Sequence, residues 1–292
     1  MLRLPGWVVA VLIVALLAAN GSADVAPPAG ADGVAPPAAG KRIAGLPSSM
    51  TALGDSVTAG VGTCVPTDLG LGCEAYSWST GTAPEVNSHY RRILAHNPAI
   101  AGRAYNLAEH GAHAADLPAQ AQAAVRLKAQ YVTILIGAND ACARNPDDMT
   151  PVDDFRYFID LALDALRTGL PKARVLIVSI PNLYRLWEVG HRLLLTRFVW
   201  LLGECPSLLD RPTSMAPADK RRRSRVANQV KRYNKELAEA CRRYGDRCRW
   251  DGGEVYRTRF SLEHVNFFDR FHPSITGQRR LAAVTYPGRF DR

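Results

Sequence analysis

Residues 131–140 read YVTILIGAND, and this stretch decides which fold class the sequence predicts. Its first six residues, Tyr131 to Ile136, are largely apolar, as expected for a strand that is buried on both faces of a parallel sheet. A polar turn, Gly137-Ala138-Asn139-Asp140, follows directly. A second run of the same kind, VLIVSI at 175–180, predicts another buried strand.

Segments in which apolar residues recur at helical spacing alternate with these strands. Two more strands are expected at 48–53 and 104–107. The expected helices cover residues 84–97, 114–128, 153–167, 218–241 and 274–284. This alternation predicts an α/β fold, a three-layer α/β/α sandwich with a central, mostly parallel sheet of the flavodoxin-like type. In such sheets, ligands bind beyond the carboxyl ends of the strands.

The N-terminus has the pattern of a secretory signal peptide over residues 1–23. Arg3 precedes an unbroken apolar run from Trp7 to Ala19, and small residues follow it, so cleavage is expected near Ala23. A membrane anchor is the alternative, but the run is shorter than the roughly 20 residues that a spanning helix needs. We therefore expect a secreted protein, extracellular or in the cell envelope.

Residues 24–47 are rich in alanine, proline and glycine and offer little apolar surface to bury, which predicts a disordered spacer. The folded domain is expected to begin near Ser48. The sequence shows no internal repeat and no second linker after that point. Residues 48–292 are therefore predicted to form one domain of about 245 residues.

The chain contains six cysteines, and in a secreted protein an even number predicts disulfides. Sequence alone does not choose among their possible pairings. Cys64 and Cys73 flank a short turn that contains glycine, as do Cys241 and Cys248, which leaves Cys142 and Cys205 as a long-range pair. A zinc site is the alternative, but the chain has no CxxC pair, so we expect no metal.

The formal net charge of +9 is concentrated in one segment. Residues 219–249 hold 12 Lys and Arg against 4 Asp and Glu, a local net charge of +8. Such a run is either a solvated helix face or a surface for peripheral contact with an anionic membrane or cell wall. Nucleic acid is not an expected partner for an exported protein.

Four polar clusters carry the chemistry, and a parallel sheet can bring them to one edge. They are Gly54-Asp55-Ser56, the turn at 106–111, the turn at 137–140 and residues 269–274. A serine hydroxyl is a weak nucleophile and needs a base within hydrogen-bond reach. His272 can serve Ser56 as that base, and Asp269 on the same loop can hold the imidazole in one tautomer.

The same clusters supply donors for a tetrahedral oxyanion. The backbone N–H of Ser56, the N–H of Gly111, which no side chain obstructs, and the carboxamide of Asn139 are suitable. We therefore expect an oxyanion hole built from Ser56, Gly111 and Asn139.

In order and spacing, these clusters resemble the blocks of the SGNH (GDSL-type) hydrolases, a family named for a Ser, a Gly, an Asn and a His. The matching residues are Ser56, Gly111, Asn139 and His272, with Asp269 as the acid of the triad. The resemblance covers residues 48–284, nearly the whole expected domain.

The pattern of paired cysteines is similar to that of the secreted bacterial branch of this family, which contains lipases, phospholipases and carboxyl esterases. Two departures stand out. Val57 replaces the leucine of the GDSL motif, and His110 precedes the glycine of the second block. The chain has no G-x-S-x-G motif, which disfavours the nucleophile elbow of an α/β-hydrolase.

Residues 192–205, RLLLTRFVWLLGEC, leave little room for a polar face. One interpretation is a buried helix that a Cys142–Cys205 bridge holds down. The other is a lipophilic wall for an acyl chain, with Leu194, Phe198 and Trp187 as the expected acyl-pocket residues.

These expectations combine into a monomeric, secreted lipase or esterase that needs no metal and no cofactor. It would cleave carboxylic esters of small molecules or lipids, including phospholipids, through a Ser-His-Asp triad and an acyl-enzyme. One alternative is a polysaccharide O-deacetylase of the same fold. Another is a catalytically silent module that binds the cell envelope through its basic helix.

Overall fold

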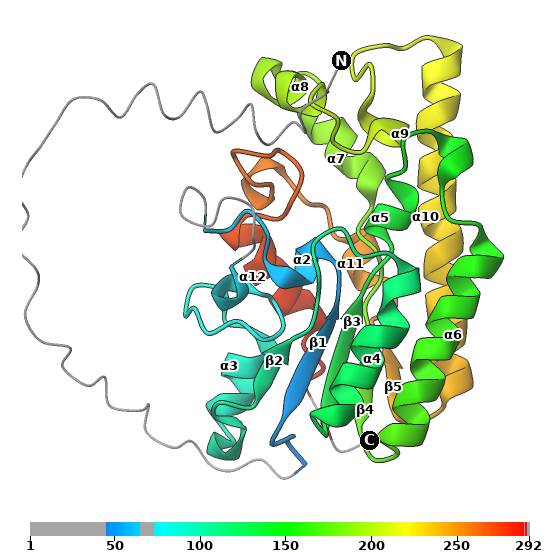
Figure 1. The fold of residues 1–292 in the computed structure, drawn as a ribbon. Helices are drawn as coiled ribbons and strands as arrows, with labels where there is room; N and C mark the ends of the chain where they lie inside the picture. The colour runs from blue at the N-terminus through cyan, green and yellow to red at the C-terminus, as the bar shows by residue number, and fades with distance from the viewer. Residues whose placement is uncertain (1–44, 65–72, 289, 291–292) are drawn as a thin grey trace, which may run out of the picture.

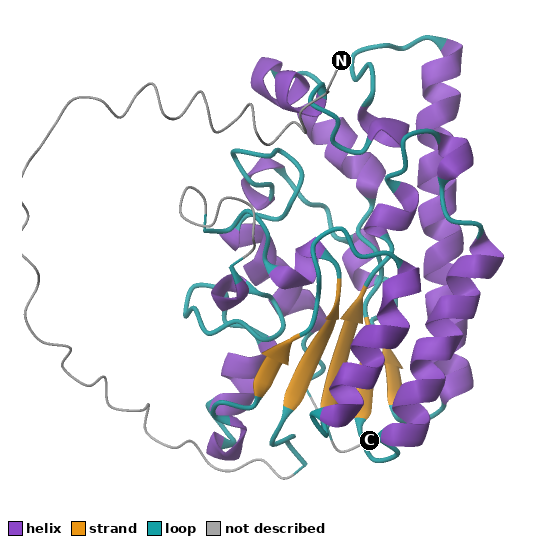
Figure 2. Cartoon of the chain, in the orientation of Figure 1, coloured by secondary structure: helices purple, strands orange, loops and turns teal. Residues whose placement is uncertain are grey.

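Five parallel strands form the centre of the computed structural model (Figures 1 and 2), which describes residues 45–64, 73–288 and 290. The strands lie in the order β2-β1-β3-β4-β5. Their bounds are β1 Met50–Gly54, β2 Ala104–Asn106, β3 Tyr131–Leu135, β4 Arg174–Ile177 and β5 Cys248–Trp250. The strand order reverses at β1, between its neighbours β2 and β3, and a ligand site is expected at their carboxyl ends.

Helices cover both faces of the sheet, which confirms the predicted three-layer α/β/α fold (Figure 2). One layer contains α4 (Leu117–Arg126), α6 (Val152–Gly169) and α10 (Pro217–Tyr244), and the other contains α3 (His89–Leu94), α11 (Glu254–Arg257) and α12 (Ile275–Thr285). Side chains alternate along β3: Val132 and Ile134 join the first core, whereas Tyr131 and Leu135 join the second. This double burial explains why the strand is largely apolar.

Two elements differ from the prediction. The helix expected over 84–97 begins only at His89, where the Ser88 hydroxyl caps it by accepting a hydrogen bond from the Arg91 amide at 3.1 Å. The edge strand β5 was not predicted at all. It has only three residues, and its central residue is Arg249, so no apolar run marks it.

The expected signal peptide and most of the expected spacer lie outside the described residues. Residues 45–47, assigned above to the spacer, already contact the domain. Arg174 donates to the Gly45 carbonyl at 2.9 Å, and Asn97 donates to the carbonyls of Leu46 and Pro47 at 3.2 and 3.0 Å. In the described part of the chain, no helix is long and apolar enough to cross a membrane.

Three disulfides are present, and they join the pairs expected from the sequence. Cys64 is bonded to Cys73 and Cys241 to Cys248, each across a short segment. The third disulfide links Cys142 to Cys205 across 63 residues.

The basic segment at 219–249 is not simply a solvated face, because two of its arginines point inward from α10. Arg223 is buried, with its guanidinium carbon 4.4 Å from the centre of the Trp187 ring. Arg222 donates to two backbone carbonyls of α9 (Pro206–Leu209) at 3.0 and 2.9 Å. Part of this charge therefore holds the fold together.

The segment at 192–205 forms α8 (Leu194–Trp200), after α7 (Leu183–Gly190), and it is not the buried helix considered above. Within α8, only Thr196 and Trp200 are buried, because a two-turn helix on the outside of the molecule presents a single face inward. Leu194 and Phe198 lie on an exposed face of this helix.

The three expected acyl-pocket residues differ in burial. Trp187 is in the core, and its indole N–H donates to the Pro212 carbonyl at 2.8 Å. The Leu194 and Phe198 side chains are exposed, at 78% and 54%, so an acyl pocket formed by these three residues stays a prediction.

Candidate active site

Three of the four polar clusters lie in the turns that follow β1, β2 and β3, which are neighbours in the sheet, and the fourth lies in the loop before α12. The turn after β1 leads into α2 (Ser56–Ala59), and the turn after β3 leads into α5 (Ala138–Ala141). Because the strands are parallel, their carboxyl ends meet at one edge, as the sequence predicted.

Gly54 shapes the turn that presents Ser56. It has a φ of +145°, and a Cβ atom at this position would lie only 2.0 Å from the Leu135 carbonyl oxygen of β3. The buried side chain of Gln120 holds it on both sides, accepting from the Gly54 N–H at 2.7 Å and donating to its carbonyl at 3.0 Å. Only glycine fits this approach of β1 to β3.

Asp55 supports the same turn as the N-cap of α2. Its Oδ1 accepts a hydrogen bond from the Val57 amide at 3.0 Å. The carboxyl is fully buried, and this burial raises its pKa to about 7, against the opposing effects of the Val57 N–H and the nearby His272. Asp55 thus positions the nucleophile candidate by capping the helix that Ser56 begins.

Ser56, His272 and Asp269 form one continuous chain of hydrogen bonds. The Ser56 Oγ lies 2.9 Å from His272 Nε2, and His272 Nδ1 lies 2.9 Å from Asp269 Oδ2. Two backbone N–H groups, those of Phe271 and His272, donate to the other oxygen of Asp269 at 2.8 and 3.0 Å. The backbone of the loop therefore holds the Asp269 carboxylate in place independently of its hydrogen bond to the imidazole.

The charges of this group set its protonation. Burial raises the pKa of Asp269, but the hydrogen bond and charge of His272 and the two N–H groups hold it below its usual value. Burial lowers the pKa of His272, but the Asp269 hydrogen bond and charge, together with Glu204 and Asp55, bring it above its usual value. An ionised Asp269 can only accept, so Nδ1 carries the proton and Nε2 accepts from the Ser56 hydroxyl.

The three expected oxyanion donors lie in the adjoining turns. In the described part of the chain, the amides of Ser56 and Gly111 donate no hydrogen bond. Gly111 has a φ of +78° in a turn that the Ala112 amide closes on the Glu109 carbonyl, and glycine adopts this conformation without strain. Asn139 Nδ2 donates one hydrogen to the Ala112 carbonyl at 2.8 Å, which leaves its second hydrogen for a ligand.

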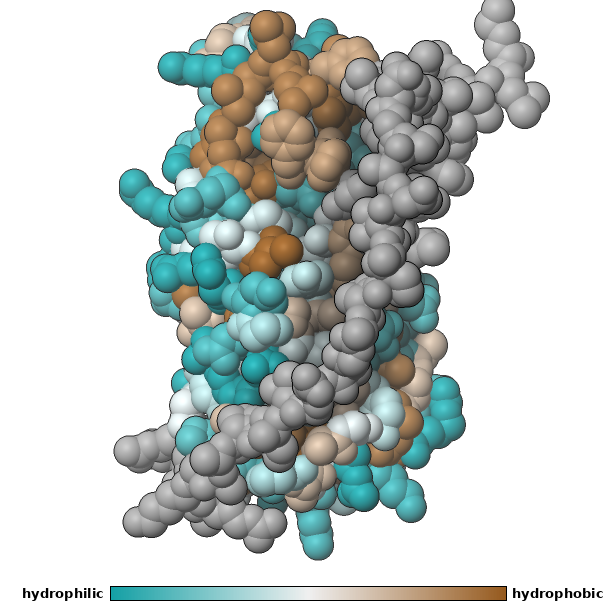
Figure 3. Space-filling model, turned by 90° about the vertical axis from the view of Figure 1, so that its left-hand side faces the viewer, coloured by the Kyte–Doolittle hydropathy of each residue, from teal (hydrophilic) through white to brown (hydrophobic). Residues whose placement is uncertain are grey.

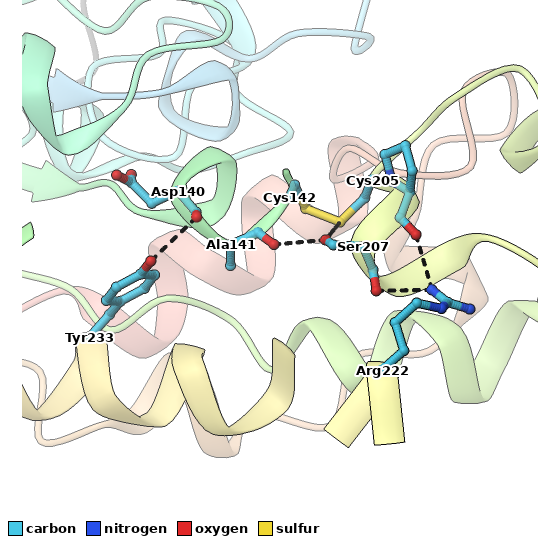
Figure 4. Close-up of a disulfide and its surroundings, with 8 residues drawn as sticks. Asp140, Ala141, Cys142, Cys205, Ser207, Arg222 and Tyr233 are labelled. Atoms are coloured by element: carbon cyan, nitrogen blue, oxygen red, sulfur yellow. Dashed lines mark hydrogen bonds between the residues drawn. A yellow bond between two sulfur atoms is a disulfide. The ribbon is translucent and has the colours of Figure 1, made fainter. Parts of the chain in front are cut away.

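The disulfide between Cys142 and Cys205 anchors the turn that carries Asn139 (Figure 4). Cys142 directly follows α5, and the disulfide ties it to the start of α9. The Ser207 hydroxyl reinforces this link by donating to the Ala141 carbonyl at 2.8 Å. Asn139 is three residues from the disulfide, so its position depends on this connection.

Helix α10 supports the same region through Tyr233 (Figure 4). The Tyr233 hydroxyl donates to the Asp140 backbone carbonyl at 3.3 Å. The Asp140 carboxylate is buried, which raises its pKa, and it accepts from the Ala114 amide at 3.0 Å. Asp140 therefore connects the turn after β3 to the segment that follows the turn after β2.

Two residues near His272 lacked an assigned role in the sequence analysis. The His110 ring centre is 5.8 Å from the His272 ring centre, and burial followed by the His272 charge lowers the pKa of His110. Glu204 is half-buried, and burial raises its pKa while it interacts electrostatically with His272 and Asp269. The one signal for Glu204 in the sequence is its position next to Cys205.

Among the described residues, neither the surface hollow elsewhere on the molecule nor the arrangement of possible metal ligands indicates a second functional site. A surface hollow lies at the opposite end of the sheet, beside Arg174 and Arg247, far from the strand ends that carry Ser56. Among the residues that the structure describes, no group of three or more His, Cys, Asp or Glu side chains is arranged to hold a metal ion.

Comparison with known proteins relates this geometry to one family. The GDSL-like Lipase/Acylhydrolase family matches residues 52–280 of the chain. This range includes every residue of the hydrogen-bonded group and all three candidate oxyanion donors.

Among curated proteins, human (Homo sapiens) membrane-associated phospholipase B1 is 31% identical over 166 residues, 48% of this chain and 11% of that protein. The mouse (Mus musculus) protein of the same name is 32% identical over 138 residues, 39% of this chain and 9% of that protein. The matched region thus spans about a tenth of the length of these relatives.

Solved structures similar to this chain include an extracellular lipase from Streptomyces rimosus, with a TM-score of 0.46 and 17% identity, covering 81% of this chain and 99% of that one. Phospholipase A1 from Streptomyces albidoflavus has the same TM-score of 0.46 and 17% identity, covering 81% of this chain and 98% of that one.

Proposed function

Because this chain belongs to the GDSL-like lipase/acylhydrolase family and is thus an ester hydrolase, we propose that it cleaves lipid esters through Ser56, His272 and Asp269. One observation carries the assignment of these residues. The 2.9 Å contacts from Ser56 Oγ to His272 Nε2 and from His272 Nδ1 to Asp269 place a base beside the hydroxyl and a carboxylate behind that base.

In the proposed mechanism, Ser56 Oγ attacks the acyl carbonyl carbon while His272 Nε2 takes the hydroxyl proton. Asp269 keeps Nδ1 protonated and stabilises the imidazolium that forms. His272 then gives its proton to the leaving alkoxide oxygen, which departs as an alcohol and leaves an acyl-enzyme. A water that His272 deprotonates attacks this ester, and collapse of the second intermediate releases the acid and restores the serine.

Negative charge develops on the carbonyl oxygen in both steps, and we assign its stabilisation to Ser56 N–H, Gly111 N–H and Asn139 Nδ2. Two observations support this assignment. The two amides have no other acceptor among the described residues, and Asn139 keeps one free hydrogen. Removing one such donor typically lowers kcat by about 10²- to 10³-fold.

Acyl lipids, phospholipids included, are the proposed substrates. The matched relatives carry the name phospholipase B1, which supports this class at the level of the aligned region. We further propose that residues 1–23 direct export, that 24–44 form a spacer and that a monomeric domain follows. The three disulfides support an oxidising compartment.

A polysaccharide O-deacetylase is the second candidate, and one observation favours it. A sugar-binding cleft needs exposed aromatic side chains beside the site, and Phe267 and Phe268 are 63% and 50% exposed just before Asp269.

A chain-length series of soluble esters separates the two candidates. The lipid esterase is expected to hydrolyse acyl chains longer than acetyl, and Ser56→Ala is expected to remove this activity. Hydrolysis confined to acetyl esters would favour the deacetylase. Equal activity of wild type and Ser56→Ala would refute the assigned nucleophile.

A further inference from the structure

An exposed apolar surface lies at the end of the molecule that carries α8 (Figure 3). It consists of side chains from α8, from the turn after it and from the loop that leads to Asp269. We call it the α8 surface, and its members are Leu194, Leu195, Phe198, Leu201, Leu202, Phe267 and Phe268. Leu194 is 78% exposed and Leu201 is 68% exposed, so these side chains are not part of the hydrophobic core. A contiguous exposed apolar patch of this kind marks an interaction surface.

This surface is attached directly to the loop of the proposed triad. The Trp200 indole N–H donates to the Arg270 carbonyl at 3.0 Å, which ties α8 to the residue between Asp269 and His272 in the loop. The Arg270 guanidinium carbon is 4.2 Å from the centre of the Phe267 ring. A partner that binds the α8 surface would therefore lie beside the candidate active site.

The charges around the α8 surface favour an anionic partner. Arg192 precedes its leucines in the sequence and Arg197 lies between them, and neither has an ion pair among the described residues. No acidic residue occurs from 189 to 203. Glu188, just before this stretch, is already paired with Arg185 at 3.1 Å. Apolar side chains bordered by free arginines are typical of elements that lie in a membrane interface.

We propose that the α8 surface docks on an anionic phospholipid bilayer, with its leucines and phenylalanines among the acyl chains and Arg192 and Arg197 at the headgroups. This inference rests on the proposed function, since the docked surface would hold Ser56 beside the layer that contains its substrates. It also moves the membrane contact away from α10, where Arg222 and Arg223 serve the fold.

Vesicle binding tests this without requiring hydrolysis. The full chain carrying Ser56→Ala is sedimented with vesicles of phosphatidylglycerol and phosphatidylcholine, and its partition coefficient is measured. Adding Leu194→Ser and Phe198→Ser should weaken partition at least about tenfold. The matched control is Tyr157→Ser with Leu161→Ser, two exposed residues with the same spacing on α6, which should leave partition unchanged.

A second variant tests the charges. Arg192→Gln with Arg197→Gln should weaken partition about thirtyfold at low salt, with a smaller effect at high salt or on pure phosphatidylcholine. Thermal unfolding of each variant within about 2 °C of the parent shows that a loss of binding is not a loss of fold.

Several results would overturn the proposal. These are a parent chain that does not sediment with the vesicles, α8 variants that partition like the parent, and an α6 control that loses as much as they do. A dimer that the Leu194 and Phe198 substitutions dissociate, without vesicle binding, would assign the surface to a second copy instead. Hydrolysis of a soluble ester by the wild type is measured separately, so failure of the proposed esterase activity remains distinguishable.

Discussion

Replacing Asp269 with asparagine isolates the role of the third member of the proposed triad. The substitution keeps the size of the side chain. The amide oxygen of asparagine can still accept from the Phe271 and His272 N–H groups, which now donate at 2.8 and 3.0 Å. The loop should therefore keep its conformation, and the unfolding temperature should change little.

The NH2 group of the new asparagine then faces His272 Nδ1, and this group can only donate a hydrogen bond. Nδ1 must accept, so the imidazole proton moves to Nε2 and points at Ser56 Oγ, where the wild type has an acceptor at 2.9 Å. The base is present but in the wrong tautomer. We expect kcat/KM for a soluble ester to fall by about 10³- to 10⁴-fold.

The pH profile provides a second, independent outcome. His272 must be neutral to act as base, and its pKa is raised in the wild type, so activity is lost as the pH falls through that raised value. Asp269→Asn removes the hydrogen bond and charge that raise this pKa and leaves the burial that lowers it. The acidic limb of the residual activity should therefore move to lower pH.

The assay measures kcat/KM from pH 5 to 9 for both proteins, alongside thermal unfolding. A loss of less than about tenfold in a folded variant would refute the assignment of Asp269. So would an acidic limb that stays in place or moves to higher pH.

Three further substitutions test the supporting structure. Asp55→Asn should be more stable than the wild type at pH 8 but not below pH 4. Burial raises the pKa of the wild-type carboxyl from 3.8 to about 7, so the wild-type protein loses stability as the pH rises through that range. Equal unfolding temperatures at pH 8 would contradict this. Gly54→Ala should lower the free energy of unfolding, measured in urea, by at least about 3 kcal/mol. Gly252→Ala is the control and should lower it by about 1 kcal/mol, because a Cβ at Gly252 would meet nothing within 4 Å. Similar losses in the two variants would argue against the close approach at Gly54. Cys142→Ser with Cys205→Ser should lower the free energy of unfolding by about 4 kcal/mol, the chain-entropy value for ends 63 residues apart, and a urea-measured loss below about 1 kcal/mol would rule out a stabilising bridge.

The sheet was predictable where both of its faces are buried. Residues 131–136 and 175–180 are largely apolar because β3 and β4 lie between two helical layers. Strand β5 could not be predicted, since an edge strand centred on Arg249 has no such run.

The positions of the candidate site residues were also predictable, because each one follows a strand or lies in the Asp269–His272 loop. The exposure of α8 was not. An apolar helix reads the same in sequence whether it is buried or exposed, and only packing decides that Thr196 and Trp200 face inward. Glu204 had no recognisable pattern, because the Cys142–Cys205 disulfide and the fold bring it near His272.

The central claim is that Ser56 is the nucleophile, and covalent labelling tests it most directly. The native protein is incubated with a fluorophosphonate, and the modified residue is located by mass spectrometry of its peptides. The account predicts one phosphonyl adduct, on Ser56, that is absent from Ser56→Ala and strongly reduced in His272→Ala. An unlabelled native protein, or an adduct on another residue that persists in Ser56→Ala, would contradict it.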